Sequence, residues 1–320
     1  MIPPILDTAC QQGFLYALAV FGIVISFRVM NFPDLTVDGS FTLGGAVLAT
    51  MLVGGYSPLM GLVVATSAGF IAGGATVFLN RKLGISKILS GILIMLMLYS
   101  VNLRIMGRAN ISLLRVPTLF SFLDERGPGN PLRIVFFFGI ALTVLLAICY
   151  LFVTRLGLFM RATGDNEFMV RCQGVYTNWL YLIGLGLANA LVALSGALVV
   201  QNQGFADVNM GAGMIITALA ALIIGESFVS GAGALRRLVL RRKRSTTRSA
   251  SALQLLPWET FSGLFAALVG AFLYFLIIAI CLRLGLAPTD LRLATGLLVI
   301  LGIALRLKGP LVETYARGKL

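Results

Sequence analysis

The chain has 320 residues, of which 58% are hydrophobic and only 12% are charged, with a mean hydropathy of +0.97. These values lie far outside the range of soluble proteins and predict an integral membrane protein. A formal net charge of +13 would suggest nucleic acid as the partner of a soluble protein. In a membrane protein, however, Lys and Arg collect in cytoplasmic loops, so we expect no nucleic-acid partner. The chain lacks histidine, the commonest metal ligand and general base, and its four cysteines have no metal-ligand spacing, so we expect no metal site.

Apolar stretches long enough to cross a bilayer recur along the whole chain. Because they lack the alternation of barrel strands, we predict an all-α integral membrane protein with about nine transmembrane helices, some of them broken. In chain order the predicted helices are Gly13–Met30, Phe41–Tyr56, Leu59–Leu79, Ile88–Met106, Leu132–Val153, Trp179–Val200, Gly211–Val229, Phe261–Leu284 and Leu291–Leu305. No polar stretch is long enough to build another domain, so residues 1–320 are predicted to form a single transmembrane domain.

Polar breaks precede the second and the seventh predicted helices. Asn31–Ser40 and Gln201–Gly213 combine Asp, Asn, Gln or Ser with flexible backbone, a combination that recurs where transporters handle solutes. The residues that we expect along a translocation pathway are Asp38, Ser40, Asn102, Gln201, Asn209 and Gly213. The glycines within the spans favour either tight helix packing or bending beside an aqueous path.

Ionisable residues are few within the predicted spans. Glu226 and Arg104 both lie near the end of an apolar run, so we expect them at the membrane interface. No relay of carboxylates is expected at the membrane midplane. Since a proton- or sodium-coupled carrier normally needs one there, this expectation points to another source of energy.

A short polar segment, Arg161–Gly174, stands in the middle of the chain between two predicted spans. Glu167 favours the positive end of a helix there, and Gly174 can end that helix. The residues able to cap its start are Thr163, Asp165 and Asn166. A polar helix of only a few turns is unstable alone in water, so we expect this segment to dock into another subunit.

The distribution of Lys and Arg selects an orientation. If the central polar segment faces the cytoplasm, most of the 25 Lys and Arg residues lie on that side. The connection Gly107–Pro131, which its prolines and glycines predict to be irregular or to hold a short surface helix, carries arginines on the opposite side. The balance predicts an N-terminus outside and a C-terminus in the cytoplasm.

No catalytic constellation is recognisable in the chain. The sequence contains no G-x-x-x-x-G-K-[ST] motif, no nucleophile elbow and no H-E-x-x-H motif, so we expect no enzyme activity and no cofactor bound by this chain. Three classes remain: a transporter driven by a docked partner, a secondary carrier or channel working without an ATPase, and a scaffold or membrane enzyme subunit.

Leu158–Val175 resembles the cytoplasmic loop of permeases from bacterial ATP-binding cassette (ABC) importers of the branched-chain amino acid and ribose type. In that family the loop reads roughly R-A-x-G-x-N-x-x-x-A-x-x-x-G-I and carries the coupling helix that inserts into the ATPase subunit. Ala218–Glu226 is similar to the family's later A-x-I-I-G-[GE] segment. Leu89–Gly107 and Phe32–Ser40 resemble a sub-branch of uncharacterised or aromatic amino acid uptake permeases.

The resemblance implies a permease of the bacterial inner (plasma) membrane that moves a small polar solute inward, an amino acid above all, with sugars and nucleosides still open. It also implies a pair of ABC ATPase subunits that bind ATP and Mg²⁺, a second permease copy (a homodimer, or a paralogue in its place) and an extracytoplasmic solute-binding protein. By analogy, the residues at or near the ATPase contact are Arg161, Gly164, Asp165, Asn166, Glu167, Phe168, Met169, Arg171 and Gly174.

The chain departs from the family pattern in a basic cytoplasmic insert at about residues 230–259, where a shorter linker is expected. The insert either lies on anionic membrane lipid, or touches the ATPase or a regulator, or forms a solvated loop that enforces orientation.

Overall fold

The computed structural model describes residues 4–114, 116–121, 131–240 and 252–285, together with positions 293, 296 and 297. Side chains are described for 7–114, 116–121, 132–229, 261–285 and the same three positions. Most of the ninth predicted helix, Leu291–Leu305, and residues 241–251 of the basic insert therefore lie outside the described residues.

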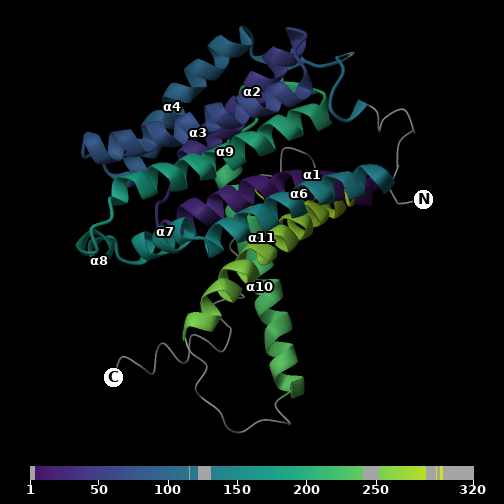
Figure 1. Ribbon diagram of the computed structural model, residues 1–320. Helices are drawn as coiled ribbons and strands as arrows, with labels where there is room; N and C mark the ends of the chain where they lie inside the picture. Colours follow the sequence, from purple (N-terminus) through teal and green to yellow (C-terminus); the bar gives the residue numbers. More distant parts are fainter. Residues whose placement is uncertain are drawn as a thin grey trace.

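Helices make up nearly all of the described chain (Figure 1). They are α1 (Pro4–Ile23), the π-helix η1 (Val24–Val29), α2 (Thr36–Val53), α3 (Pro58–Lys82), α4 (Lys87–Met106), α6 (Pro131–Val153), α7 (Arg155–Asp165), α8 (Glu167–Cys172), α9 (Thr177–Gln203), α10 (Met214–Leu240) and α11 (Ala252–Arg283). In the described part of the chain, 7 helices are long and apolar enough to cross a membrane, and Met214–Val229 is a shorter apolar helix. The predicted all-α membrane fold is confirmed, whereas the number of nine spans stays a prediction.

The spans form two layers (Figure 1). Helices α2, α3, α4 and α9 lie in one layer, and α1, α6 and α11 lie in the other. Helix α1 contacts both α9 and α11, so it joins the layers. The short helices α7 and α8 lie together at one end of the spans, at the opposite end from the N-terminus.

Local signals explain most helix boundaries. Ser57 caps α3 by accepting a hydrogen bond from the Met60 N–H, and Pro58 occupies the first turn, as is typical of helix starts. The second span begins at Thr36 rather than at the predicted Phe41. The reason is that the Asp34 carboxylate accepts the Thr36 N–H at 2.9 Å, and the polar side chains of the first turns find partners on neighbouring helices.

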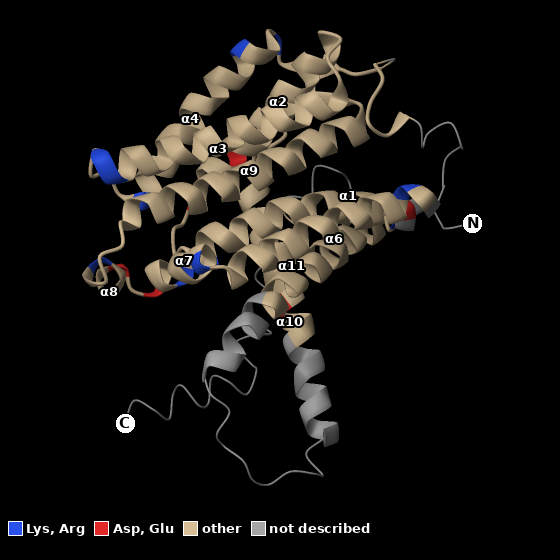
Figure 2. Cartoon of the chain, in the orientation of Figure 1, with Lys and Arg blue, Asp and Glu red and all other residues tan. Residues whose placement is uncertain are grey.

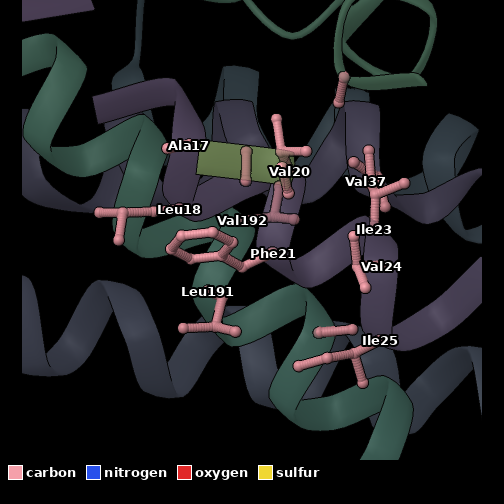
Figure 3. Close-up of a cluster of buried hydrophobic side chains, with 14 of the residues drawn as sticks. Ala17, Leu18, Val20, Phe21, Ile23, Val24, Ile25, Val37, Leu191 and Val192 are labelled. Atoms are coloured by element: carbon pink, nitrogen blue, oxygen red, sulfur yellow. The ribbon is translucent and has the colours of Figure 1, made fainter. Parts of the chain in front are cut away.

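Apolar side chains of α1 and η1 fill the space against α9 (Figure 3). Phe21, Ile25 and Val192 are completely buried in this cluster, and Leu191 lies beside them. Side chains packed this closely require the helix backbones to lie close together.

Glycine allows that approach between α2 and α9. A Cβ at Gly44 would overlap the carbonyl oxygen of Ala193, and a Cβ at Gly196 would overlap that of Phe41. The packing role of the span glycines is therefore confirmed at these positions, where no wider side chain fits.

A small antiparallel sheet was not predicted. β1 (Asn110–Ser112) pairs with β2 (Phe205–Asp207), with Ile111 opposite Ala206. The sheet joins the connection after α4, expected to be irregular or helical, to the polar break after α9. Sequence reasoning missed it because a pairing of three residues has almost no periodic signal.

Replacement of Gly196 by Ala tests the close contact between α2 and α9. We expect G196A to lower the free energy of unfolding in detergent by about 1–3 kcal/mol, because the new methyl group forces backbones apart. The measurement is thermal or denaturant unfolding of the purified protein. G139A on α6 is the matched control, since a Cβ at Gly139 meets nothing within 4 Å. Equal stability of G196A and G139A would contradict the described packing.

Candidate functional site

The central polar segment forms helices α7 and α8, which we call the coupling segment together with the turn to Thr177. Asn166 caps α8, since its Oδ1 accepts the Met169 N–H at 3.1 Å, and Gly174 follows α8 with φ of +79°. Of the three residues predicted to cap this helix, only Asn166 does so. Thr163 and Asp165 lie on α7, a helix that the sequence analysis missed although buried Gly157, Met160 and Thr163 recur on one face at intervals of three.

Glu167 turns toward the transmembrane helices rather than toward solvent. Its carboxylate receives a bidentate pair of hydrogen bonds from Arg81 at the end of α3, with lengths of 2.7 and 2.9 Å. Thr177, at the start of α9, donates at 2.9 Å, and Arg171 forms an ion pair one helical turn away. The Arg81 guanidinium also stacks 3.9 Å from the centre of the Tyr181 ring. Glu167 therefore tethers α8 to α3 and α9.

The Glu167 network changes the acidity of the carboxyl group. Burial by itself raises the pKa of Glu167, but hydrogen bonds from Arg81 and Thr177 and the charges of Arg81 and Arg171 outweigh it. The resulting pKa is about 2, against an ordinary value of 4.5. Glu167 is thus ionised throughout the physiological range, so protonation does not release the network there.

The remaining surface of the coupling segment presents apolar side chains to solvent. Phe168 is 77% exposed and Met169 is 49% exposed. Val170, in contrast, is fully buried and packs α8 against the hydrophobic core. The other predicted coupling residues that are exposed are Asp165, Asn166, Arg171 and Gly174. Arg161, Gly164 and Glu167 are only partly exposed. The coupling segment therefore consists of an exposed tip and an inward-facing tether.

Gly164 connects the coupling segment to the first span. A Cβ at this position would overlap the carbonyl oxygen of Val29 at the end of η1. The missing side chain lets the backbones of α7 and η1 touch, so a displacement of α7 meets η1 directly.

A second polar region lies in the interior, at the start of α2. We call Asp34, Thr36, Asp38, Ser40 and Thr42 the interior polar cluster. Asn189, in the middle of α9, donates to Asp34 at 2.6 Å and accepts from Ser40 at 2.7 Å. The hydroxyls of Thr36 and Thr76, on α3, lie 2.7 Å apart. The cluster therefore bonds α2 to both α9 and α3.

Asp38 and Thr42 bond the same part of α2 to the start of α10. The two carboxylate oxygens of Asp38 accept the N–H groups of Gly213 and Ile215, at 3.0 and 2.9 Å. The Thr42 hydroxyl accepts the Gly211 N–H at 3.1 Å. The first N–H groups of a helix have no partner within the helix itself, so α2 supplies the cap that α10 needs. The two predicted polar breaks therefore meet.

The predicted pathway residues divide between two places. Asp38 meets Gly213 at the start of α10, Ser40 bonds to Asn189 of α9, and Asn102 donates to the Gly39 carbonyl between them at 3.2 Å. Gln201 lies apart and accepts the Leu119 N–H at 2.8 Å. Asn209 is exposed beyond β2, with its N–H bonded to the Asp207 carboxylate at 2.8 Å. Gln201 and Asn209 therefore lie at the end of the molecule that holds the small sheet.

One carboxylate is buried more deeply than the sequence analysis anticipated. Asp34 is fully buried against Asn189, which lies near the midpoint of the 27-residue helix α9. A single carboxylate is not a relay, so the expected absence of a carboxylate relay at the midplane stays a prediction. The sequence does hold a signal that was missed, because polar residues alternate at positions 34, 36, 38, 40 and 42. A lone Asn within an otherwise apolar helix is the other half of that signal.

These features define a class: a multi-span helical membrane protein with polar breaks that meet in its interior and a short exposed helix at one end. Residues 5–235 match the family model described as branched-chain amino acid transport system / permease component. The chain belongs to this permease family and is a multi-pass protein of the inner membrane.

The chain is also similar to permeases of known transport systems. The chain is 33% identical over 293 residues to a tyrosine transport system permease protein of Clostridioides difficile, covering 92% of this chain and 88% of the relative. It is 27% identical to a ribose import permease protein of Escherichia coli K12, covering 69% and 68%. A galactofuranose transporter permease protein of the same strain is 26% identical, covering 62% and 57%. No solved structure matches the chain.

The Glu167 network makes a pH prediction. Because the folded pKa of about 2 lies below the ordinary 4.5, its stabilising effect is present above pH 4.5 and is lost as the pH falls through 2. We expect hydrogen exchange of residues 167–172, corrected for intrinsic rates, to be equally protected above about pH 5 and to lose protection progressively as the pH falls from about 4.5 toward 2. E167Q is the control and should show weaker protection above about pH 5, without this loss between about pH 4.5 and 2. Equal protection of wild type and E167Q, or wild-type protection that does not fall below about pH 4.5, would contradict the network.

Proposed function

We propose that this permease is the transmembrane subunit of an ABC importer and moves an amino acid inward, powered by a separate ATPase subunit. The observation that carries the proposal is the coupling segment. Phe168 and Met169 expose an apolar surface on a helix too short to be stable alone, while Glu167 holds that helix rigidly to α3 and α9. An exposed apolar tip on a rigid tether suits a partner that delivers mechanical work.

An amino acid is the solute that the relatives favour. The tyrosine transport permease aligns over 92% of this chain, whereas the ribose and galactofuranose permeases align over 69% and 62% with lower identity. Amino acids carry charged amino and carboxylate groups, which require polar side chains or helix termini along a pathway. The region between α2 and the start of α10, with Asp38 and Ser40, is our proposed part of that pathway.

The assembly implied by this function contains further subunits. ATP and Mg²⁺ would be bound by a pair of ATPase subunits beneath α8, next to a second copy of the permease or a paralogue, with a solute-binding protein on the opposite side. The distribution of charge supports this orientation, because Arg81 and Lys82 end α3 beside α8, and Arg155 and Arg171 lie on α7 and α8 themselves. Figure 2 draws basic residues at this end of the molecule. By the positive-inside rule that end faces the cytoplasm, which puts the N-terminus outside.

One observation favours a second candidate, an ion-coupled carrier. The buried Asp34 beside the partly buried Asp38 supplies the interior carboxylates that such a carrier needs. Asp34 is already bonded to Thr36 and Asn189, and Asp38 to the start of α10, so both act as structural acceptors. Amino acid uptake by the chain alone, driven by a proton or sodium gradient in vesicles without ATP, would support the carrier instead.

Substitution at the exposed tip tests the importer. We expect tagged wild-type permease, extracted from its native membranes in mild detergent, to carry a vanadate-sensitive ATPase activity. F168D should reduce that activity at least tenfold, because a carboxylate in an apolar groove loses its hydration. L114D is the matched control, since Leu114 is 83% exposed on the connection after α4, far along the chain from the tip. Equal ATPase activity in F168D, L114D and wild type would overturn the proposed docking surface.

A further inference from the structure

The first span ends in an unusual helix. Residues Val24–Val29 form the π-helix η1, and the Phe32 N–H reaches back to the Ser26 carbonyl at 2.9 Å. A π-helical turn is rare and frequently lies at a functional site. η1 is therefore the place in the first span where we look for a change of winding.

Consecutive residues of η1 contact two different parts of the molecule. Val29 meets Gly164 of the coupling segment through its carbonyl oxygen. Arg28 forms an ion pair with Glu226 of α10, whose side chain is only 16% exposed. The coupling segment and α10 thus contact consecutive residues of η1.

The same stretch of chain also holds the other end of α10. Asp38 and Thr42 bond the turn that starts α10, while Arg28 lies at Glu226, twelve residues after the helix begins. Residues 28–42 therefore contact α10 at both ends of its described apolar part. A change of winding in η1 alters the distance between these two contacts, so α10 must tilt or shift with it.

We propose that the Arg28–Glu226 pair transmits movement of the coupling segment, through η1, to α10. The inference rests on the proposed function, because it takes the ATPase as the source of that movement. Arg28 and Glu226 are positioning residues: they touch no solute and set the position of the helix that starts at the interior polar cluster.

The contact is electrostatic, so it is testable by exchange of charges. The background is a variant in which Cys10, Cys149, Cys172 and Cys281 are replaced by Ser and T217C is added in the first turns of α10, where Thr217 is partly exposed. The probe is the rate of maleimide labelling of that cysteine in the co-purified complex, without nucleotide and after trapping with ATP, Mg²⁺ and vanadate. The variants are R28E, E226R and R28E/E226R, with R28K as the charge-keeping control.

We expect the labelling rate in the background variant and in R28K to differ between the two states. R28E and E226R should reduce the ratio of the two labelling rates about fivefold. This change corresponds to the ~1 kcal/mol available from a partly exposed ion pair. R28E/E226R should restore the response, because the two charges attract each other again. A variant that had only damaged the structure would not be rescued by a second charge reversal. If a charge-reversed variant aggregates, R28Q and E226Q replace the single variants and must show the same loss.

The outcomes separate this inference from the importer itself. If no ATPase activity co-purifies with wild-type permease, the importer and the transmission contact fall together. If the complex forms but labelling in R28E and E226R responds to vanadate as in the background variant, the contact is refuted and the importer stands. A background variant without any response, or a double variant that stays defective, also overturns the contact.

Discussion

The structure depends on one constraint: polar groups buried among the spans must be bonded within the protein, because a buried polar group without a partner is costly. The start of α2 holds several such groups in succession, and Asn189 satisfies two of them at once. That requirement fixes α2 against α9 more narrowly than apolar packing can, since dispersion contacts tolerate small sliding motions whereas short hydrogen bonds do not. The glycines at the α2–α9 contact then allow the approach that these bonds need.

The same constraint explains why the two polar breaks come together. A helix that begins in the interior leaves N–H groups without partners, and α10 begins beside α2. Both carboxylate oxygens of Asp38 accept hydrogen bonds from that turn. Burial of a carboxylate without partners would be unfavourable, but here its negative charge caps the positive end of the helix dipole. The start of α10 is thereby coupled to the stretch that continues back through η1 to Gly164 and the coupling segment.

The sequence predicted the parts of this arrangement that depend on neighbouring residues. The membrane class and most span boundaries followed from hydropathy, and local capping signals narrowed the cap of α8 to three residues that include Asn166. The pairing of Asp34 with Asn189 did not, because these residues are 155 positions apart and a single chain gives no sign of which distant polar groups meet. The direction of Glu167 was missed for the same reason, since its partner Arg81 lies on another helix. Periodicity assigns a face to a helix but does not identify the helix that the face contacts.

A double-mutant cycle on Asp34 and Asn189 tests the central constraint most directly, by denaturant unfolding of the purified protein in detergent. D34A and N189A should each lower the free energy of unfolding by about 1–3 kcal/mol, because each leaves a buried partner unsatisfied. The loss of stability in the double variant should be smaller than the sum of the two single losses by about 0.5–3 kcal/mol, because neither side chain then remains without its partner. Strictly additive losses, or single variants as stable as wild type, would contradict the account.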